Sequence, residues 1–217
     1  MTAHHADLLL LVLLMTDLYM VATSRIAACI RTSAVQGLVL ALFPLALSSG
    51  AAAPQLFHAV LIGGGTLALK ALLIPWLLAR VLRKVAIRRE VEPFVSLHVS
   101  LLLGAALVGI AFWLSMHLPT RAGTPALLVP VALATLLIGF LVVVSRKKAI
   151  TQVVGYLTME NGVFVFGMSL AHEMPFVVEL GILLDLLVGV LVFGLVIHHV
   201  SAEFDHIDTD ALSELKD

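Results

Sequence analysis

The chain has 217 residues, of which 61% are hydrophobic and 12% are charged, and its formal net charge at pH 7 is −1. Soluble domains contain about 45–50% apolar and about 25% charged residues, so this composition excludes an ordinary soluble domain and predicts a protein of the lipid bilayer. A net charge near zero argues against nucleic-acid binding, and the single cysteine, Cys29, excludes an internal disulfide.

Apolar segments recur along the chain at lengths that match membrane-spanning helices. A helix needs about 20 apolar residues to cross a bilayer, so the chain has room for about seven crossings. Because each segment is continuously apolar rather than alternating, we predict an all-α integral membrane protein and not a β-barrel. In chain order, the expected spans are residues 8–24, 33–49, 56–80, 94–116, 125–144, 150–170 and 176–198.

Basic residues predict the orientation of this bundle of about seven transmembrane helices. They cluster in the breaks after the first, third and fifth spans, at Arg25, Arg31, Arg80, Arg83, Lys84, Arg88, Arg89, Arg146, Lys147 and Lys148. The alternate breaks contain Arg121 alone. Cytoplasmic loops carry an excess of Lys and Arg. We therefore expect the N-terminus outside, the C-terminus in the cytoplasm, Cys29 in a short basic loop, and a multi-pass protein of the cell inner (cytoplasmic) membrane.

Several ionisable residues lie inside the expected spans. Lys70 occurs in "TLALKALLIPW", Glu160 in "TMENGVF", and Glu179 and Asp185 in "VVELGILLDLLVG"; Asp17, in "LLMTDLYMV", is a weaker candidate. Glu160 lies about 15 Å into its span at helical rise, near the middle of an apolar core about 30 Å thick. A central charge costs about 2.5–3.5 kcal/mol on insertion, so such residues face the bundle interior and mark ion paths or proton relays.

We therefore predict a proton or ion pathway formed by Glu160, Asp185, Glu179 and Lys70. A carboxylate placed between an apolar environment and a neighbouring cation can exchange a proton near neutral pH, because the two influences oppose each other. Accessory candidates are Asp17, Asn161 and His198. For His198, the alternative is a position at the membrane–water interface without a role in proton transfer. The structural alternative for the acids is a salt bridge of Lys70 with Glu160 or Asp185 that only holds helices together.

Other local patterns favour helix packing over catalytic chemistry. Glu179 and Asp185 are six residues apart, so they face directions about 120° apart on a helix and suit two stations of a path better than a chelating pair. Glycines of the last two spans permit close helix approach: Gly162, Gly167, Gly181 and Gly189. No arrangement of residues indicates catalysis or metal binding, so we expect no catalytic residue, no metal and no cofactor in this chain.

Four segments of the sequence resemble a known family. "VVGYLTMENGVF", followed by "PFVVELGILLDLLVGVLVF", resembles the E component of hydrogenase-4 and of related formate-hydrogenlyase complexes, and "LALKALLIPW" and "SRKKAITQ" also look like that family. The resemblance covers most of the chain. The last three spans of this family are similar to the K subunit of respiratory complex I. By that resemblance, Glu160 takes the place of the key glutamate on the second K-subunit helix, and Asp185, or alternatively Glu179, that of the acid on its third.

The resemblance implies a division of the chain and a place in a complex. Residues 1–144 would form an N-terminal five-span region, residues 145–200 a K-subunit-like region that completes the bundle with the fifth span, and residues 201–217 an acidic cytoplasmic tail. The chain would be a non-catalytic membrane-arm subunit of a group 4 nickel–iron hydrogenase complex, contributing protonatable residues to proton or sodium translocation coupled to redox chemistry. Implied partners are antiporter-like membrane subunits, a membrane-foot subunit, and hydrogenase large and small subunits that hold the nickel–iron and iron–sulfur centres.

Two other functions stay open at this point. One is a stand-alone secondary transporter, for which internal repeats would be the sequence sign, and no convincing repeat is evident. The other is a purely structural membrane scaffold of a complex I-related assembly. The sequence leaves open which ion moves, which direction is physiological and which electron donor is used.

Overall fold

The structure of the chain is a computed structural model that describes residues 2–48, 53–84, 94–118, 125–170 and 194. The elements within these ranges are helical, as the continuous apolar segments predict. In chain order they are α1 (Thr2–Ala22), α2 (Ile26–Leu47), α3 (Ala53–Thr66), the π-helical segment η1 (Leu67–Leu73), α4 (Ile74–Lys84), α5 (Leu97–Ser115), α6 (Leu128–Ser145) and α7 (Ala149–Leu170).

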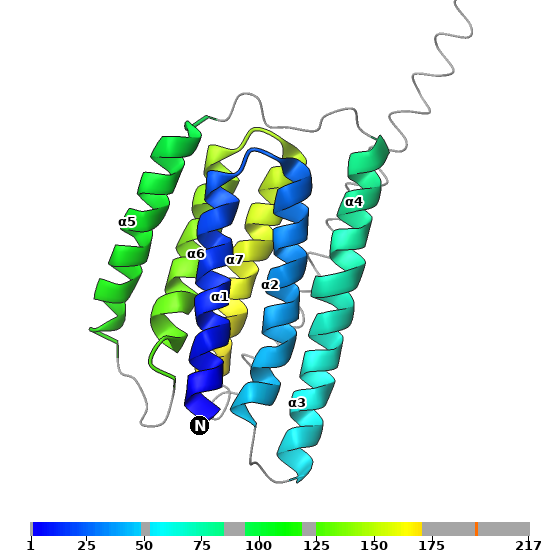
Figure 1. Cartoon of the computed structure of the whole chain (residues 1–217), viewed down its shortest axis with the longest axis vertical. Coiled ribbons are helices and arrows are strands. Elements are labelled where there is room, and N and C mark those ends of the chain that lie inside the picture. Colours follow the sequence, from blue (N-terminus) through cyan, green and yellow to red (C-terminus); the bar gives the residue numbers. More distant parts are fainter. Residues whose placement is uncertain (1, 49–52, 85–93, 119–124, 171–193, 195–217) are drawn as a thin grey trace, which may run out of the picture.

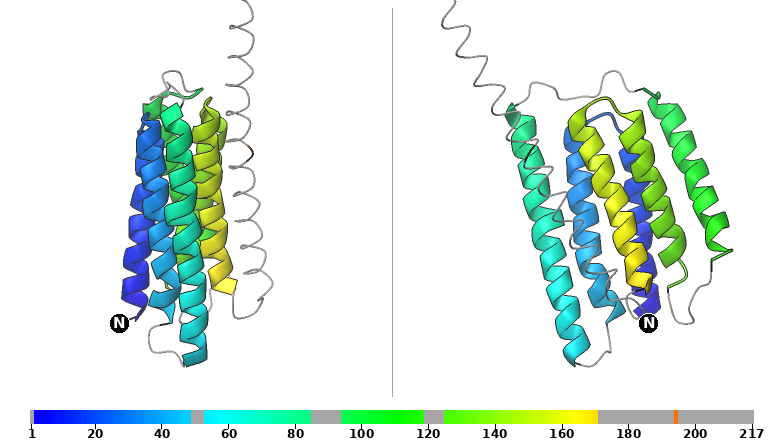
Figure 2. Two further views of the ribbon diagram at one scale, coloured as in Figure 1. Left: turned by 90° about the vertical axis from the view of Figure 1, so that its right-hand side faces the viewer. Right: turned by 180° about the vertical axis from the view of Figure 1, so that it is seen from behind.

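The helices form a bundle with a four-helix centre (Figure 1). α1, α2, α6 and α7 pack against one another there, and α6 and α7 share the most extensive contact. α5 flanks this group beside α1 and α6, while α3, η1 and α4 continue one another as a single rod beside α2 (Figures 1 and 2). With α3, η1 and α4 taken as one rod, helices that follow one another along the chain run in opposite directions across the bundle (Figure 1).

In the part of the chain that the structure describes, five helical stretches are long and apolar enough to cross a membrane, which supports the expected integral membrane protein. These stretches are His4–Ala22, Ile26–Leu47, Ala53–Arg83, Leu97–Ser115 and Leu128–Ser145. α7 has 22 residues, a length of about 33 Å at helical rise, but Glu160, Asn161 and several small or polar residues lower its hydropathy. The seventh expected span, 176–198, lies outside the described residues together with the tail, so the count of seven stays a prediction.

The expected loop between the first two spans is wrong. α2 already begins at Ile26, so only residues 23–25 separate it from α1. Cys29 is buried in an apolar cluster with Met20 and Ile26 instead of lying in a basic loop. The physical reason is that "IAACI" is apolar and compatible with a helix, and Arg31 takes an exposed position on the same helix.

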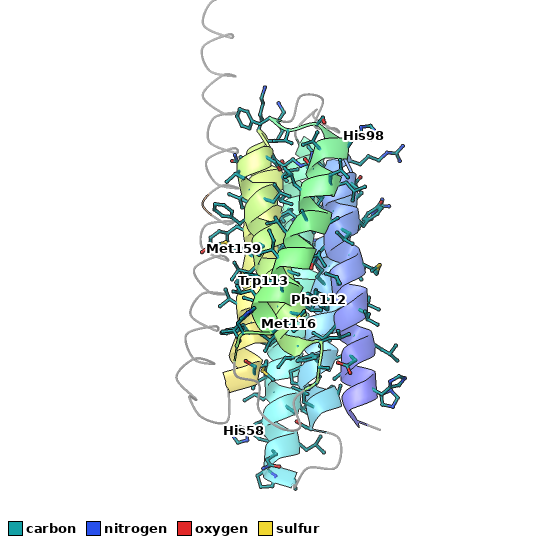
Figure 3. All side chains as sticks on the ribbon, turned by 90° about the vertical axis from the view of Figure 1, so that its left-hand side faces the viewer. His58, His98, Phe112, Trp113, Met116 and Met159 are labelled. Carbon is teal, nitrogen blue, oxygen red and sulfur yellow. The ribbon has the colours of Figure 1, made fainter. Side chains whose placement is uncertain are left out.

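The outer faces of the bundle are apolar, as a lipid environment requires. Large exposed side chains cover α5 and the α3–α4 rod, and the exposed residues Trp113 of α5 and Met116, directly after the end of α5, lie on the face of the bundle shown in Figure 3. The connection from α1 to α2, the end of α4 and the connection from α6 to α7 all lie at one end of the bundle (Figure 1). This end carries Arg25, Lys84 and Lys147, an arrangement that fits the expected one-sided distribution of positive charge.

Glycines allow α6 and α7 to approach closely. A methyl group at Gly162 would lie 2.5 Å from the backbone nitrogen of Leu136 and 2.7 Å from the carbonyl oxygen of Ala132. Gly139 of α6 faces the backbone of Met159 and Gly155 in the same way. Small residues at such positions are a usual means of packing membrane helices. The expected role of Gly162 in close helix approach is therefore confirmed.

We expect Gly162→Ala to destabilise the chain by about 3 kcal/mol, at the upper end of overpacking effects, because the new methyl group meets backbone that cannot rotate away. Gly109→Ala is the matched control, since a methyl group there has nothing within 4 Å. The control should be neutral, or stabilising by up to about 1 kcal/mol from helix propensity alone. Urea titration of both variants in detergent micelles measures the difference, and equal stability of the two would contradict the close α6–α7 contact.

Candidate functional site

A group of polar side chains, called the polar network below, occupies the centre of the bundle. Its members come from α1, α2, η1, α6 and α7, and none of them is more than 4% exposed. Buried polar groups in a membrane protein almost always face one another and mark functional positions. The network consists of Asp17, Gln36, Lys70, Thr135, Thr158, Glu160 and Asn161.

An ion pair forms one end of the polar network. The ammonium group of Lys70 lies 3.1 Å from Oε1 of Glu160 and donates a hydrogen bond of 3.2 Å to Oδ1 of Asn161. The same ammonium group lies 5.3 Å from the ring centroid of Phe164, within reach of a cation–π interaction. The structure therefore brings Lys70, Glu160 and Asn161 together, and the contact of Lys70 with Glu160 is one of the two pairings that the structural alternative named.

Local backbone features bring Lys70 to this position. Lys70 lies inside η1, and short π-helical insertions in α-helices occur frequently at functional sites. η1 lies directly against α2, where a methyl group at Gly37 would come within 2.6 Å of the carbonyl carbon of Lys70. Glycine at position 37 is thus required for the rod to approach α2 closely enough for Lys70 to reach α7.

Two amide side chains connect the ion pair to Asp17. Nδ2 of Asn161 donates to Oε1 of Gln36 at 3.1 Å, and Nε2 of Gln36 donates to Oδ1 of Asp17 at 2.7 Å. The hydroxyl of Thr135 donates to Oδ2 of Asp17, also at 2.7 Å. The hydroxyl of Thr158 lies 3.4 Å from Oε1 of Gln36 and 3.0 Å from the carbonyl oxygen of Val154. Asp17 is therefore a full member of the network.

Glu160 keeps unused hydrogen-bonding capacity. Within the described ranges, neither of its carboxylate oxygens has a partner with hydrogen-bond geometry. The approach of the Lys70 ammonium to Oε1 is an ion-pair contact by distance. A carboxylate has acceptor capacity for several donors, so Glu160 can accept a proton or a further donor without losing an existing hydrogen bond to the described residues.

Arg146 takes a different place from the one its sequence position suggests. It follows the fifth span and counts among the basic residues of a loop, yet it is only 2% exposed. Its Nη2 donates to the carbonyl oxygens of Val21 at 2.8 Å and Thr23 at 3.4 Å. These carbonyls belong to the C-terminal end of α1 and the connection after it, where a cation is favoured. Arg146 therefore fixes the end of α6 to the end of the helix that carries Asp17.

The remaining predicted site residues lie outside the described part of the chain. Glu179, Asp185 and His198 are not placed relative to the polar network, so their part in a pathway stays a prediction. Gln36, Thr135 and Thr158 are members that the sequence prediction missed. The available signal was a glutamine inside an otherwise apolar span, in "AVQGLVL", since a polar amide in lipid needs a partner.

Comparison with known proteins finds relatives across nearly the whole chain. The Mycobacterium tuberculosis protein Rv0085 is 34% identical over 207 residues, which cover 94% of this chain and 93% of the relative. Hydrogenase-4 component E of Escherichia coli K12 and that of Shigella flexneri are each 28% identical over 207 residues, covering 94% of this chain and 94% of the relative. No family model matches the chain, and no solved structure matches it.

Proposed function

The chain belongs to the same protein family as Rv0085 of Mycobacterium tuberculosis, and from its homology to hydrogenase-4 component E we propose that it is a membrane subunit of a hydrogenase-type oxidoreductase complex. The membrane-spanning character of its helices supports this assignment. Such a subunit would lie in the cell inner membrane with its basic end in the cytoplasm.

The proposed activity is a contribution to proton or sodium translocation coupled to redox chemistry in the complex. The observation that carries it is the buried pair of Lys70 and Glu160, at 4% and 2% side-chain exposure, in the middle of two membrane-length helical stretches. A pair placed so deep is costly to desolvate and is weak evidence for stability by itself. An ionisable group that can accept a proton at this depth is the property that an ion path needs.

In this proposal the chain supplies protonatable side chains and its partners supply the redox centres. Glu160 binds and releases the proton, Lys70 compensates its charge, and Asp185 or Glu179 provides the next station. The chain itself is non-catalytic and binds no cofactor. The partners are antiporter-like membrane subunits, a membrane-foot subunit and hydrogenase large and small subunits with nickel–iron and iron–sulfur centres. Region 145–200 would correspond to the K subunit of complex I.

Co-purification tests membership of the complex directly. We expect affinity purification of the chain from native membranes in mild detergent to bring down antiporter-like membrane subunits together with a nickel–iron hydrogenase large subunit, identified by mass spectrometry. A tagged, unrelated multi-pass membrane protein from the same cells is the control for non-specific recovery. Recovery of the intact chain without redox partners would contradict the proposal and would favour a stand-alone transporter, which liposome transport by the purified chain would then test.

A further inference from the structure

The hydrogen bonds of the polar network run in one direction from a cation to a carboxylate. The ammonium group of Lys70 has donors only, so the atom of Asn161 that faces it must be the oxygen. The amide nitrogen of Asn161 then faces Gln36, whose oxygen accepts. The amide nitrogen of Gln36 in turn faces Asp17. The chemistry of the two ends therefore fixes the orientation of both amides, independently of any ambiguity between amide oxygen and nitrogen.

Among the residues that the structure describes, Lys70 consequently interacts with two acids, one directly and one through the amides. One ammonium group neutralises one carboxylate, and a second uncompensated carboxylate is very costly in the interior of a membrane bundle. With both hydrogen bonds donated to it, Asp17 has the surroundings of an ionised carboxylate. Glu160 has no hydrogen-bond donor with good geometry among the described residues, but the Lys70 ammonium group 3.1 Å away favours its ionised form as well, so either acid can be the one that holds the proton.

The two acids lie at different depths. Asp17 is five residues before the end of α1, or about 8 Å from it at helical rise, whereas Glu160 is eleven residues after the start of α7, or about 16 Å from it. Both of these helix ends belong to the basic end of the bundle (Figure 1). Asp17 is thus nearer to that end, and Glu160 is nearer to the middle.

We infer that Asp17 and Glu160 share one proton and act as two linked stations of the path, joined by Gln36, Asn161 and Lys70. When Asp17 is ionised, the amides and Thr135 donate to it and Glu160 holds the proton. When Asp17 takes up a proton from the basic end, the O–H bond forms at Oδ2, and the Thr135 hydroxyl turns from donor to acceptor. Glu160 then releases its proton to the rest of the path and pairs with Lys70, so the total of bound protons is unchanged.

The amides in this scheme transmit the charge state and do not carry the proton. Loss of the negative charge at Asp17 weakens the hydrogen bonds that lead from Lys70 through Asn161 and Gln36 to Asp17. The Lys70 ammonium group then interacts more strongly with Glu160. Thr135 can make this change because a hydroxyl both donates and accepts, and in a helix it can bond the carbonyl of the preceding turn. Each acid exchanges protons on its own side, so the linkage prevents both stations from being empty or filled at once.

Other titratable groups on the helices packed around Asp17 point elsewhere. Arg146 of α6 binds carbonyl groups at the end of α1, and Asp7 of α1 accepts from the backbone nitrogen of Leu127. Cys29 lies in an apolar cluster, with Tyr156 packed against it. The exposed titratable groups of these helices are His4, His5, Tyr19, Arg31 and His98. The charged partners of Asp17 within the described ranges are therefore those of the network itself.

Infrared titration of the full chain, in its detergent-purified complex, tests the shared proton. We expect the wild type at neutral pH to show the carbonyl stretch of a protonated carboxyl group that belongs to this pair of acids. Asp17→Asn and Glu160→Gln should each remove that band, because the acid left behind is then compensated by Lys70 and ionises. Gln36→Leu should keep both acids but abolish their linkage, so that two interdependent steps of the titration become two independent ones.

A band that persists with unchanged titration in Asp17→Asn would overturn the inference, because the two acids would then titrate independently. If Asp17→Asn does not assemble, Thr135→Val decides the matter. It should alter the titration of the shared band without touching a contact of Glu160, and an unaltered titration would count against the linkage. The inference rests on the proposed function for its place in a transport path, but the two can fail separately. If transport survives Glu160→Gln, the proposed transport path is contradicted. The infrared titration tests only whether Asp17 and Glu160 share a proton.

Discussion

Replacing Glu160 with glutamine is expected to reduce redox-driven ion transport to the background of vesicles that lack the complex, while hydrogenase activity with an artificial dye stays at the wild-type level. Glutamine keeps the volume of the side chain and an oxygen that faces the Lys70 ammonium, so the contact of 3.1 Å can persist as a hydrogen bond. It cannot bind or release a proton. Transport in reconstituted vesicles, measured beside dye reduction on the same preparation, separates the two effects.

Asp7→Asn is the matched control for this experiment. It also neutralises a carboxylate on a central helix, but Asp7 contacts the backbone nitrogen of Leu127 at 3.3 Å and has no contact with the polar network. We expect the control to transport at the wild-type rate. Full transport by Glu160→Gln would remove Glu160 from the path, and equal losses in both variants would indicate a general effect on assembly.

Replacing Lys70 with methionine should lower the free energy of unfolding by about 3 kcal/mol, since breaking a buried pair leaves its partner uncompensated. The substitution removes the cation beside Glu160, the donor to Asn161 and the contact with Phe164 together. Methionine fills a similar apolar volume, so the loss reports polar interactions and not a cavity. Urea titration in detergent micelles measures it.

The double variant Lys70→Met/Glu160→Met distinguishes a structural from a functional role of the pair. Replacing both members of a buried ion pair by apolar groups is often neutral or stabilising. We therefore expect the double variant to recover most of the lost stability. A loss of about 1 kcal/mol should remain, because the side-chain carbonyl of Asn161 no longer accepts a hydrogen bond from Lys70. Transport should stay absent despite this recovery. A scaffold role predicts the opposite, namely recovery of stability and function together.

The class of fold can be predicted from the sequence because the lipid bilayer constrains which segments can cross it. Spans must be apolar and helical, so composition and continuity predict the helices α3–α4, α5, α6 and α7 to within a few residues. Glu160 and Lys70 stood out for the same reason, since a charge in such a segment is costly. A salt bridge between them is one of the structural alternatives that the sequence leaves open, and the structure places the Lys70 ammonium group 3.1 Å from Oε1 of Glu160.

Other parts of the site could not be derived from local sequence. Asp17 is the weaker candidate by sequence, yet its partners Gln36 and Thr135 come from two helices that are distant along the chain. Uncharged Gln and Thr give only a weak signal in a span, so their joint role depends on packing. Arg146 and Cys29 were misplaced for a related reason. A loop is inferred from charge, but tertiary contacts with α1 bury both residues.

Electron microscopy of the purified complex tests the partners and the polar network in one measurement. We expect a hydrogenase-type large subunit in the same particle as this chain. We also expect continuous density from Glu160 and Lys70 through Asn161 and Gln36 to Asp17 inside the bundle. A particle without redox subunits would contradict membership of a hydrogenase-type complex, and Lys70 and Glu160 on separate faces toward lipid would contradict the buried pair.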